Sequence, residues 1–427
     1  VSSIKAYRFQ LRLRPAQGAA LRHIAGGLRW VWNQALAEQR ARHARGERYA
    51  GHAEMCKWLT AWRNAPGTMW LSEGPVHPQQ QVLRRLDEAY KRFFAKTGGL
   101  PSFKRRGKEP GIRFPDPKQF RLDVANGRIQ LPKLGWVRMR MSQEFTGVLR
   151  NVSLTREGAG ASARWSASIQ VQTGETIAAL GVAPTLGIDL GLSVFAATSQ
   201  GEIVAPLKAM AQQQCRLHRY QRAVSRKQKG SANRRKAVAR LANLHRKIAR
   251  QRADWLHKLT TDLADRHPVI ALEDLKVKNM SSCAKGTAEK PGKKVRQKAG
   301  LNRGILDAAW GEFRRQLGYK TQWRGGQTIL VNPAYTSRTC RVCGYEAAEN
   351  RKTQSAFICV ACGHTEHADV HAAKNILAAG HAAWAKEQAP SPDACGGAVR
   401  RGRRASAGRA APVKQEPTKE ISHAAHG

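Results

Sequence analysis

Acidic side chains are scarce in this chain of 427 residues: Asp and Glu number 30 against 74 Lys and Arg, which gives a formal net charge of +44. Long apolar runs are also missing, since no stretch approaches the roughly 20 residues of a membrane-spanning helix. The start of the chain carries Lys5, Arg8, Arg12 and Arg14 in place of the apolar stretch of a signal peptide. We therefore expect no membrane partner and a cytoplasmic location, with nucleic acid as the polyanion that balances the charge.

Cysteine is sparse as well, and its distribution excludes the disulfide framework of a small secreted protein. Four of the eight cysteines form two Cys-x-x-Cys pairs separated by 15 residues: Cys340, Cys343, Cys359 and Cys362. This spacing is typical of a zinc ribbon, in which four thiolates surround one Zn²⁺. A four-thiolate site has no open coordination position, so we predict one structural Zn²⁺ without a catalytic role. His364 and His367 are expected to contact solvent or nucleic acid rather than this zinc.

The length suggests two to four domains, at roughly 100–200 residues each. Apolar residues recur at helical spacing from Pro15 and again over 78–96, whereas 110–180 contains short segments of alternating polarity. We therefore expect a helical segment, 15–109, inserted into a small barrel-like β module formed by 1–14 and 110–180.

From residue 181 the pattern changes to alternating strands and helices, which indicates an α/β domain over 181–385. Two apolar strands in it end in the carboxylates Asp189 and Glu273, and residues 305–317 are predicted to form one helix. Periodicity then disappears in a stretch rich in Ala, Gly, Pro, Ser and Arg. Residues 386–427 are therefore predicted to be a disordered tail.

Three of the rare carboxylates end or begin the most regular elements of the α/β half: Asp189, Glu273 and Asp369. A single carboxylate at a strand end or helix start most often caps that element. Three together can hold two divalent cations about 4 Å apart, the arrangement of two-metal phosphodiester hydrolysis. Mg²⁺ prefers such oxygen ligands. The sequence therefore indicates a nuclease site, provided that the fold brings the three carboxylates together.

Four stretches contain these carboxylates and the first cysteine pair: Gly187-Ile-Asp-Leu-Gly, Leu272-Glu-Asp-Leu, Asn332-Pro-Ala-Tyr-Thr-Ser-Arg-Thr-Cys-Arg-Val-Cys-Gly and Ala368-Asp-Val-His-Ala-Ala-Lys-Asn-Ile. In these stretches, and over roughly residues 4–385, the chain resembles the TnpB (OrfB) proteins of bacterial insertion sequences, relatives of the type V CRISPR effector nucleases. The resemblance implies a RuvC-like, RNase H-fold nuclease domain over 181–385, with the zinc ribbon inserted at 336–366. It also implies that the three carboxylates bind two catalytic Mg²⁺ ions.

For the N-terminal half, the resemblance implies a wedge-type β-barrel, 1–14 and 110–180, interrupted by a helical recognition lobe, 15–109. Proteins of this family resemble one another in binding a transposon-derived guide RNA and cutting matching double-stranded DNA beside a short adjacent motif. One residue departs from the family pattern: His371 stands where an Asn commonly follows the last catalytic Asp by two positions. We expect this histidine to preserve activity while altering metal affinity or pH dependence.

Positive charge is concentrated between residues 216 and 252, which contain fourteen Lys or Arg and no Asp or Glu. Apolar residues at helical spacing indicate that one face of this stretch packs while the other is cationic. These charges would repel one another without a polyanion, so we expect nucleic-acid contact here, with further basic clusters at Lys104–Arg106 and Lys276–Arg303. The predicted contact residues are Arg216, Arg219, Arg222, Arg226, Lys227, Lys229, Arg234, Arg235, Lys236, Arg240, Arg246 and Lys247.

The favoured hypothesis is an RNA-guided, Mg²⁺-dependent DNA endonuclease of a transposon, which acts in the bacterial cytoplasm and on the nucleoid when bound to DNA. Arg338, just before the ribbon, is a candidate for stabilising negative charge in the transition state. A transposase that joins DNA ends could use the same carboxylates, and a non-cutting regulator could bind the same nucleic acids. The three intact acidic positions count against the regulator, and only the family resemblance favours hydrolysis over strand transfer.

Overall fold

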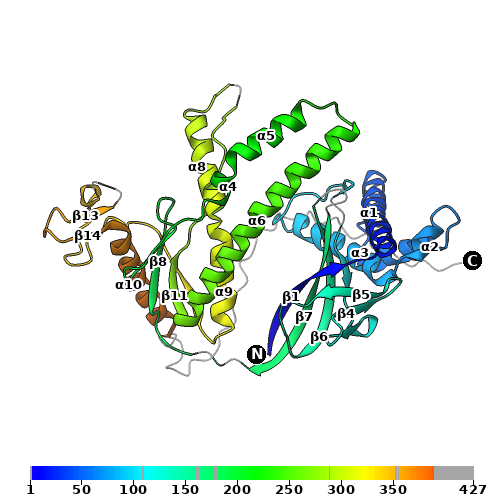
Figure 1. The fold of residues 1–427 in the computed structure, drawn as a ribbon, viewed down its shortest axis with the longest axis horizontal. Helices are drawn as coiled ribbons and strands as arrows, with labels where there is room; N and C mark the ends of the chain where they lie inside the picture. The colour runs from blue at the N-terminus through cyan, green and yellow to red at the C-terminus, as the bar shows by residue number, and fades with distance from the viewer. Residues whose placement is uncertain are drawn as a thin grey trace, which may run out of the picture.

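The computed structural model describes residues 2–107, 110–158, 163–176, 178, 180–287, 289–351, 353 and 355–388. These residues form two lobes, an N-terminal lobe built on an antiparallel sheet and a C-terminal lobe built on a mixed sheet (Figure 1). The predicted tail lies outside the described residues, except that 386–388 continue the last helix. No helix in the described part of the chain combines the length and the apolar character needed to cross a membrane.

The N-terminal sheet has seven strands in the order β2-β6-β7-β1-β5-β4-β3, and neighbouring strands are antiparallel. The strands are β1 (Ser2–Arg12), β2 (Ile112–Phe114), β3 (Arg121–Asp123), β4 (Arg128–Leu131), β5 (Gly135–Arg140), β6 (Val148–Glu157) and β7 (Arg164–Thr176). Alternate residues of β7 from Trp165 to Val171 are buried, as expected for a strand with one face on a core. Among the described residues, β2 and β3 end the sheet without pairing to each other, so closure into a barrel stays a prediction.

Helices from the inserted segment pack against this sheet. They are α1 (Pro15–Ala44), α2 (His52–Asn64) and α3 (Val76–Phe94), with the short 3-10 helices η1 (Met69–Glu73) and η2 (Pro117–Gln119). Pro15 occupies the first turn of α1, where its missing N–H costs no hydrogen bond. Leu28 of α1 and Leu83 of α3 share one buried core with Phe9 of β1. The helical segment and the β module therefore form one packed lobe.

The C-terminal sheet has the order β10-β9-β8-β11-β12. Its strands are β8 (Leu186–Leu190), β9 (Ala196–Thr198), β10 (Ile203–Val204), β11 (Val269–Glu273) and β12 (Gln327–Val331). β8, β11 and β12 are parallel, whereas β9 is antiparallel to β8 and to β10. Helices α6 (Ala232–Arg266) and α9 (Trp310–Gln322) cover one face, and α10 (Ala368–Gln388) covers the other, which explains why β11 is apolar on both faces (Figure 1).

Two glycines allow α10 to lie directly on the sheet. A Cβ at Gly187 would lie 2.2 Å from the carbonyl oxygen of Ala373, and one at Gly380 would lie 2.5 Å from a side chain of β11. Any larger residue at either position would push the helix away from the strands. Because Asp189 follows Gly187 by two residues and Asp369 begins α10, this close contact brings both carboxylates to one end of the sheet.

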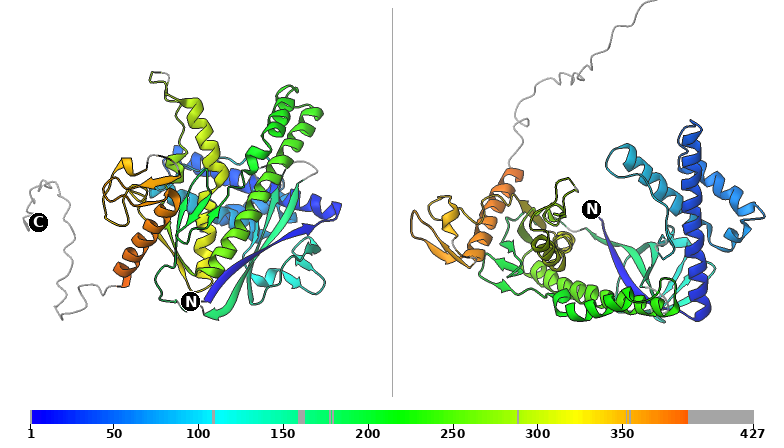
Figure 2. Two further views of the ribbon diagram at one scale, coloured as in Figure 1. Left: turned by 60° about the vertical axis from the view of Figure 1, so that its left-hand side comes forward. Right: turned by 90° about the horizontal axis from the view of Figure 1, so that it is seen from above.

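The basic stretch forms a helical hairpin of α5 (Gln214–Ser225) and α6, which extends from the C-terminal lobe towards the N-terminal sheet (Figure 2). The helices separate at Gly230, whose φ of 88° favours glycine. Ser231 then caps α6, since its side chain accepts a hydrogen bond from the backbone N–H of Arg234.

The single helix predicted over 305–317 is wrong. The structure has two helices there, α8 (Val295–Ala308) and α9, because Ala309 adopts a left-handed conformation with φ 56°. The sequence gives no sign of this break, since alanine rarely adopts positive φ. The remaining elements are α4 (Ala209–Gln212), α7 (Val277–Met280), η4 (Ala348–Asn350), β13 (Ala356–Ile358) and β14 (Thr365–His367).

Candidate active site

The three predicted carboxylates line one pocket of about 240 Å³. Asp189 and Glu273 reach it from neighbouring parallel strands, because Ile188 of β8 is opposite Leu272 of β11 and each carboxylate is the next residue. Asp369 reaches it from the first turn of α10. The fold therefore brings together carboxylates that are far apart in the sequence, and their role as metal ligands stays a prediction.

The pocket places two of these carboxylates in surroundings that oppose ionisation. Burial, together with the negative charges of Glu273 and Asp369, raises the pKa of Asp189 to about 7. Burial also raises the pKa of Glu273, against the opposing effects of a hydrogen bond from Thr336 and the charge of Arg351. The pocket thus holds negative charge that the described protein groups compensate only in part, as expected of a cation-binding site.

Among the described residues that line this pocket, Arg351 is the positively charged one, and it is not one of the predicted site residues. Its guanidinium donates to Asp369 Oδ1 at 2.6 Å, and its charge lowers the pKa of both Asp189 and Glu273. Arg338, the predicted candidate, is exposed and does not line the pocket. Arg351 lies inside the ribbon, between the cysteine pairs, where no local pattern distinguishes it from a surface arginine.

Polar side chains around the pocket hold its walls in place. Thr336 Oγ1 donates to Glu273 Oε1 at 2.6 Å, and Asn375 of α10 donates to the carbonyl oxygens of Thr336 and Thr339, both at 2.8 Å. Asn350 is fully buried and bonds three backbone groups of the ribbon, which fixes the residue just before Arg351. Hydrogen bonds thus hold the segment at Thr336 against Glu273 and α10, and they hold the ribbon next to Arg351.

The four cysteines of the ribbon also come together. Their sulfur atoms all lie within 4.8 Å of one another, with Cys340 and Cys362 3.7 Å apart and Cys343 and Cys359 3.6 Å apart. A tetrahedral zinc site with Zn–S bonds of about 2.3 Å separates its sulfurs by roughly 3.8 Å. This four-cysteine cluster fits one structural Zn²⁺, as the spacing predicted.

The predicted nucleic-acid contacts lie on the α5–α6 hairpin. All twelve are exposed except Arg234 and Arg246, which are half-buried. Arg246 donates to the carbonyl oxygen of Glu157, and Arg250 contacts the carboxylate of the same residue, so the hairpin touches the N-terminal sheet through Glu157. Most of its other cationic side chains are exposed, whereas Arg252 is half-buried and pairs with Asp307.

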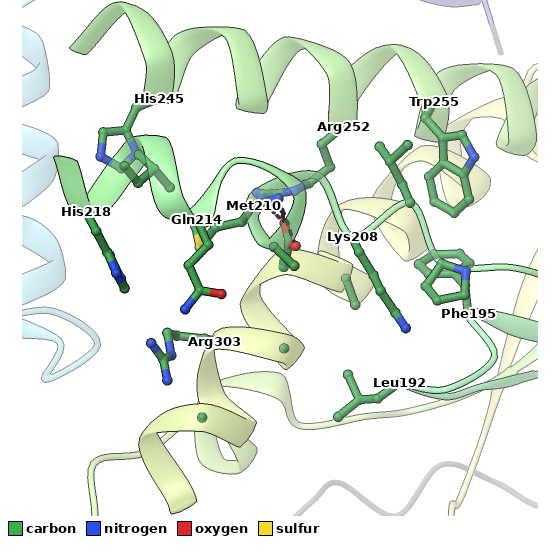
Figure 3. A pocket seen from close by; sticks show the side chains of 18 of the residues that line it. Leu192, Phe195, Lys208, Met210, Gln214, His218, His245, Arg252, Trp255 and Arg303 are labelled. Carbon is green, nitrogen blue, oxygen red and sulfur yellow. Dashed lines mark hydrogen bonds and ion pairs between the residues drawn. The ribbon is translucent and has the colours of Figure 1, made fainter. Parts of the chain in front are cut away.

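A cavity of about 570 Å³ lies at the base of this hairpin, against α8 and the loop that follows β8 (Figure 3). Phe195 and Trp255 form its apolar end, while His218 and Arg303 lie at the other end. Leu192 lines both this cavity and the carboxylate pocket. The cavity at the base of the hairpin and the carboxylate pocket are therefore neighbours.

Comparison with known families and structures agrees with this geometry. A family profile described as "Probable transposase" matches residues 168–284, one described as "Cas12f1-like, TNB domain" matches 310–376, and one described as "Helix-turn-helix domain" matches 3–48. In this structure the third span contains β1 and the single 30-residue helix α1. A chain in a cryo-EM structure of the Cas12f1-sgRNA-target DNA complex matches with a TM-score of 0.54 at 13% identity, covering 85% of this chain and 83% of that one.

The fold therefore defines an α/β protein of the Cas12f type. "Putative RNA-guided DNA endonuclease InsQ" of Escherichia coli (strain K12) is 44% identical over 98% of each chain. A protein of Streptomyces pristinaespiralis with the description "Putative RNA-guided DNA endonuclease" is 34% identical over 97% of this chain and 96% of its own length. The chain belongs to the TnpB (OrfB) family of RNA-guided DNA endonucleases, as its motifs predicted.

Proposed function

We propose that this chain is a metal-dependent, RNA-guided DNA endonuclease whose C-terminal lobe is a RuvC-like, RNase H-fold nuclease. The observation that carries the proposal is the convergence of Asp189, Glu273 and Asp369 on one pocket. Whole-length similarity to a protein described as an RNA-guided DNA endonuclease supports the same activity. The proposed substrate is double-stranded DNA that matches a transposon-derived guide RNA and lies next to a short adjacent motif.

The residues of the pocket fit two Mg²⁺ ions. The donors are carboxylate oxygens, which Mg²⁺ prefers, and burial together with two neighbouring carboxylates raises the pKa of Asp189, which supports binding of a cation there. When bound, the ions supply Lewis-acid activation for in-line attack on the scissile phosphate. The three carboxylates hold and orient them, and Thr336 fixes the carboxylate of Glu273.

Arg351 is the proposed stabiliser of negative charge on the scissile phosphate. Its guanidinium lies in the pocket because it pairs with Asp369. Cations bound to the carboxylates would compete for that pairing and leave the guanidinium donors available to phosphate oxygens, which accept such bonds well. Arg338 stays a weaker candidate, since it is exposed outside the pocket.

The partners proposed are guide RNA and target DNA, held through their phosphates by the basic hairpin. The exposed Lys and Arg of α5 and α6 support this role, because contacts of this kind recognise backbone charge rather than sequence. The four-cysteine cluster is proposed to hold one structural Zn²⁺ that supports the segment around Arg351. The place of action proposed is the bacterial nucleoid.

The deciding experiment is to purify the chain, sequence the RNA bound to it, and offer matching duplex DNA with Mg²⁺. A discrete RNA with a constant part and a variable end, together with cleavage only of the matching DNA, supports the proposal. Recovery of joined DNA ends would favour the second candidate, a transposase, which the description of the family profile over 168–284 suggests. Mixed cellular RNA without cleavage would favour a non-cutting regulator.

A further inference from the structure

A second group of potential metal ligands lies beside the four-cysteine cluster and has no part in the proposed reaction. It consists of His364, which follows the second cysteine pair, Glu366 of β14 and His371 of α10. His371 Nδ1 lies 3.1 Å from Glu366 Oε2, and His364 Nε2 lies 3.6 Å from the same oxygen. The three ligand atoms all lie within 4.8 Å of one another.

Hydrogen bonding leaves the nitrogen of His371 that faces Glu366 without a proton in the neutral ring. The Nε2 atom lies 3.0 Å from the carbonyl oxygen of Thr339, which can only accept, so Nε2 carries the hydrogen. In the neutral ring Nδ1 therefore directs a lone pair at a carboxylate oxygen, and either a second proton or a metal ion between the two atoms makes this contact favourable. Metal-binding histidines commonly show this arrangement, with the second ring nitrogen donating to a backbone carbonyl.

His364 completes the group with a buried, unused nitrogen. Its Nε2 is shielded from solvent and has no hydrogen-bond partner among the described residues. The side chain as a whole is partly exposed, so the expected contact with solvent or nucleic acid stays a prediction, but Nε2 itself is buried. The ring of His371 stacks on Phe357 at 3.7 Å between centroids and is fully buried, so its orientation is fixed.

We propose that His364, Glu366 and His371 form a second metal site, which takes one borderline divalent cation such as Zn²⁺. Tetrahedral bonds of about 2.0–2.1 Å to nitrogen and oxygen place ligand atoms roughly 3.3 Å apart, between the observed 3.1 Å and 3.6 Å. Lys374 bonds the other carboxylate oxygen of Glu366 and leaves Oε2 for the metal. Three ligands leave one position for water.

A metal ion at this site would connect two parts of the C-terminal lobe, the ribbon and α10. Glu366 belongs to the ribbon, whereas His371 belongs to α10 and follows Asp369 by two residues. The bound ion links the ribbon to the first turn of α10 and so fixes the helix start that presents Asp369 to the pocket. The family's more common Asn at position 371 would not supply the third ligand in the same way. This inference does not depend on nuclease activity.

The test is the zinc content of the untagged, full-length chain, after equilibration with Zn²⁺ in the presence of excess Mg²⁺ and removal of loosely bound metal. We expect two zinc ions per chain in the wild type and one in His364→Ala and in His371→Asn. The matched control is His381→Ala, on the same helix but hydrogen-bonded to the carbonyl of Pro184, which should retain two. Asp189→Ala should also retain two, since its pocket is not the zinc site.

One zinc in the wild type, or two in His364→Ala, would overturn the proposal and leave a proton between His371 and Glu366. His371 is fully buried, so His371→Asn could fail to fold. His364→Ala removes a partly exposed ring and therefore provides the same test in a chain that should fold. Cobalt substitution gives an independent readout. The first equivalent of Co²⁺ should show thiolate charge-transfer absorption, and the second should add d–d bands without it. Absence of the second, saturable step would contradict the assignment.

Discussion

Asp189 and Asp369 line the same pocket, but they reach it from different parts of the fold and have different surroundings. Asp189 ends a strand in the centre of the sheet, where burial and neighbouring carboxylates raise its pKa to about 7. Asp369 begins a helix beside the ribbon and pairs with Arg351 at 2.6 Å. On the strand side, buried carboxylates therefore lie close together, whereas on the ribbon side Asp369 is paired with an arginine.

This difference indicates that the two sides of the pocket have different roles in the proposed reaction. The strand side is rigid, since Asp189 and Glu273 end adjacent parallel strands that are buried on both faces. The ribbon side is held by polar contacts and by the segment that contains the four-cysteine cluster, so we expect its position to depend on the proposed zinc site, remote from the carboxylates. We therefore expect cation binding to depend mainly on the strand side and charge stabilisation on the ribbon side.

The largest effect should come from the strand side. Asp189→Ala is expected to lower DNA cleavage by more than roughly 100-fold, because loss of a direct ligand should exceed the 10–100-fold cost of disturbing an outer one. Affinity for guide RNA should stay near that of the wild type, since Asp189 is not one of the cationic side chains that would bind RNA phosphates. Single-turnover assays measure the cleavage rate, and RNA-binding titrations measure the affinity for guide RNA. Loss of RNA binding together with cleavage would contradict the assigned role.

On the ribbon side, Arg351→Ala should lower the cleavage rate by about 10²–10³-fold, the usual cost of removing one donor to transition-state charge. Arg351→Lys should recover only part, because an ammonium lacks the paired donors of the guanidinium. Arg338→Ala is the matched control, an exposed arginine of the same region, and should change the rate by less than about threefold. A larger loss in Arg338→Ala than in Arg351→Ala would reverse the assignment.

The pH dependence of Mg²⁺ binding should also distinguish the strand side of the pocket from the ribbon side. Since a proton competes with the cation for Asp189, Mg²⁺ affinity should fall about tenfold per pH unit below pH 7, and Asp189→Asn should remove most of this slope. Calorimetric titration with Mg²⁺ between pH 5.5 and roughly 8.5 measures it. A slope unchanged in Asp189→Asn would mean that another group controls the dependence.

In the metal-free protein, the raised pKa of Asp189 favours the folded state at low pH, whereas it weakens Mg²⁺ binding at low pH. A carboxyl whose folded pKa is raised adds stability below its unfolded value near 3.8, and this contribution is lost as the pH rises through about 7. The shift corresponds to at most roughly 4 kcal/mol. The metal-free wild type should therefore lose stability towards pH 8 relative to Asp189→Asn, and Mg²⁺ should restore it. Thermal unfolding with and without Mg²⁺ tests this.

Much of the strand side could be predicted from the sequence, because its signals are local. Short, mostly apolar segments that lead into Asp189 and Glu273 predicted β8 and β11, and the shared direction of parallel strands explains why the two carboxylates meet. The cysteine spacing likewise predicted the four-cysteine cluster. Helices α1 and α3 were visible in their apolar spacing, whereas α2 buries only Met55 and Leu59 and was missed.

The ribbon side could not be predicted in the same way, because its contacts depend on tertiary packing. Arg351 reaches Asp369 only because the ribbon folds back onto α10, and nothing near it in the sequence marks that contact. The break at Ala309 is similar: packing holds an alanine at φ 56°, a conformation that its own preference disfavours. His364 and His371 were separate residues in the sequence and become one group only in the fold.

The smallest effect on the cleavage rate should come from substitutions outside the pocket. They test whether only the residues of the pocket take part in the chemical step. Replacing Arg226, Lys227 and Lys229 by Ala removes three exposed charges at the tip of the hairpin. RNA affinity should fall by a similar factor for every sequence, and the salt dependence of binding should decrease by about one for each phosphate that is no longer bound. Lys258→Ala, which removes an exposed charge paired with Asp254 on α6, is the control and should leave the salt dependence unchanged. At saturating RNA and DNA the cleavage rate of the triple variant should equal that of the wild type, because the hairpin holds the polymer while the pocket acts on it. A rate loss at saturation comparable to that of Asp189→Ala would show that the hairpin also takes part in the chemistry.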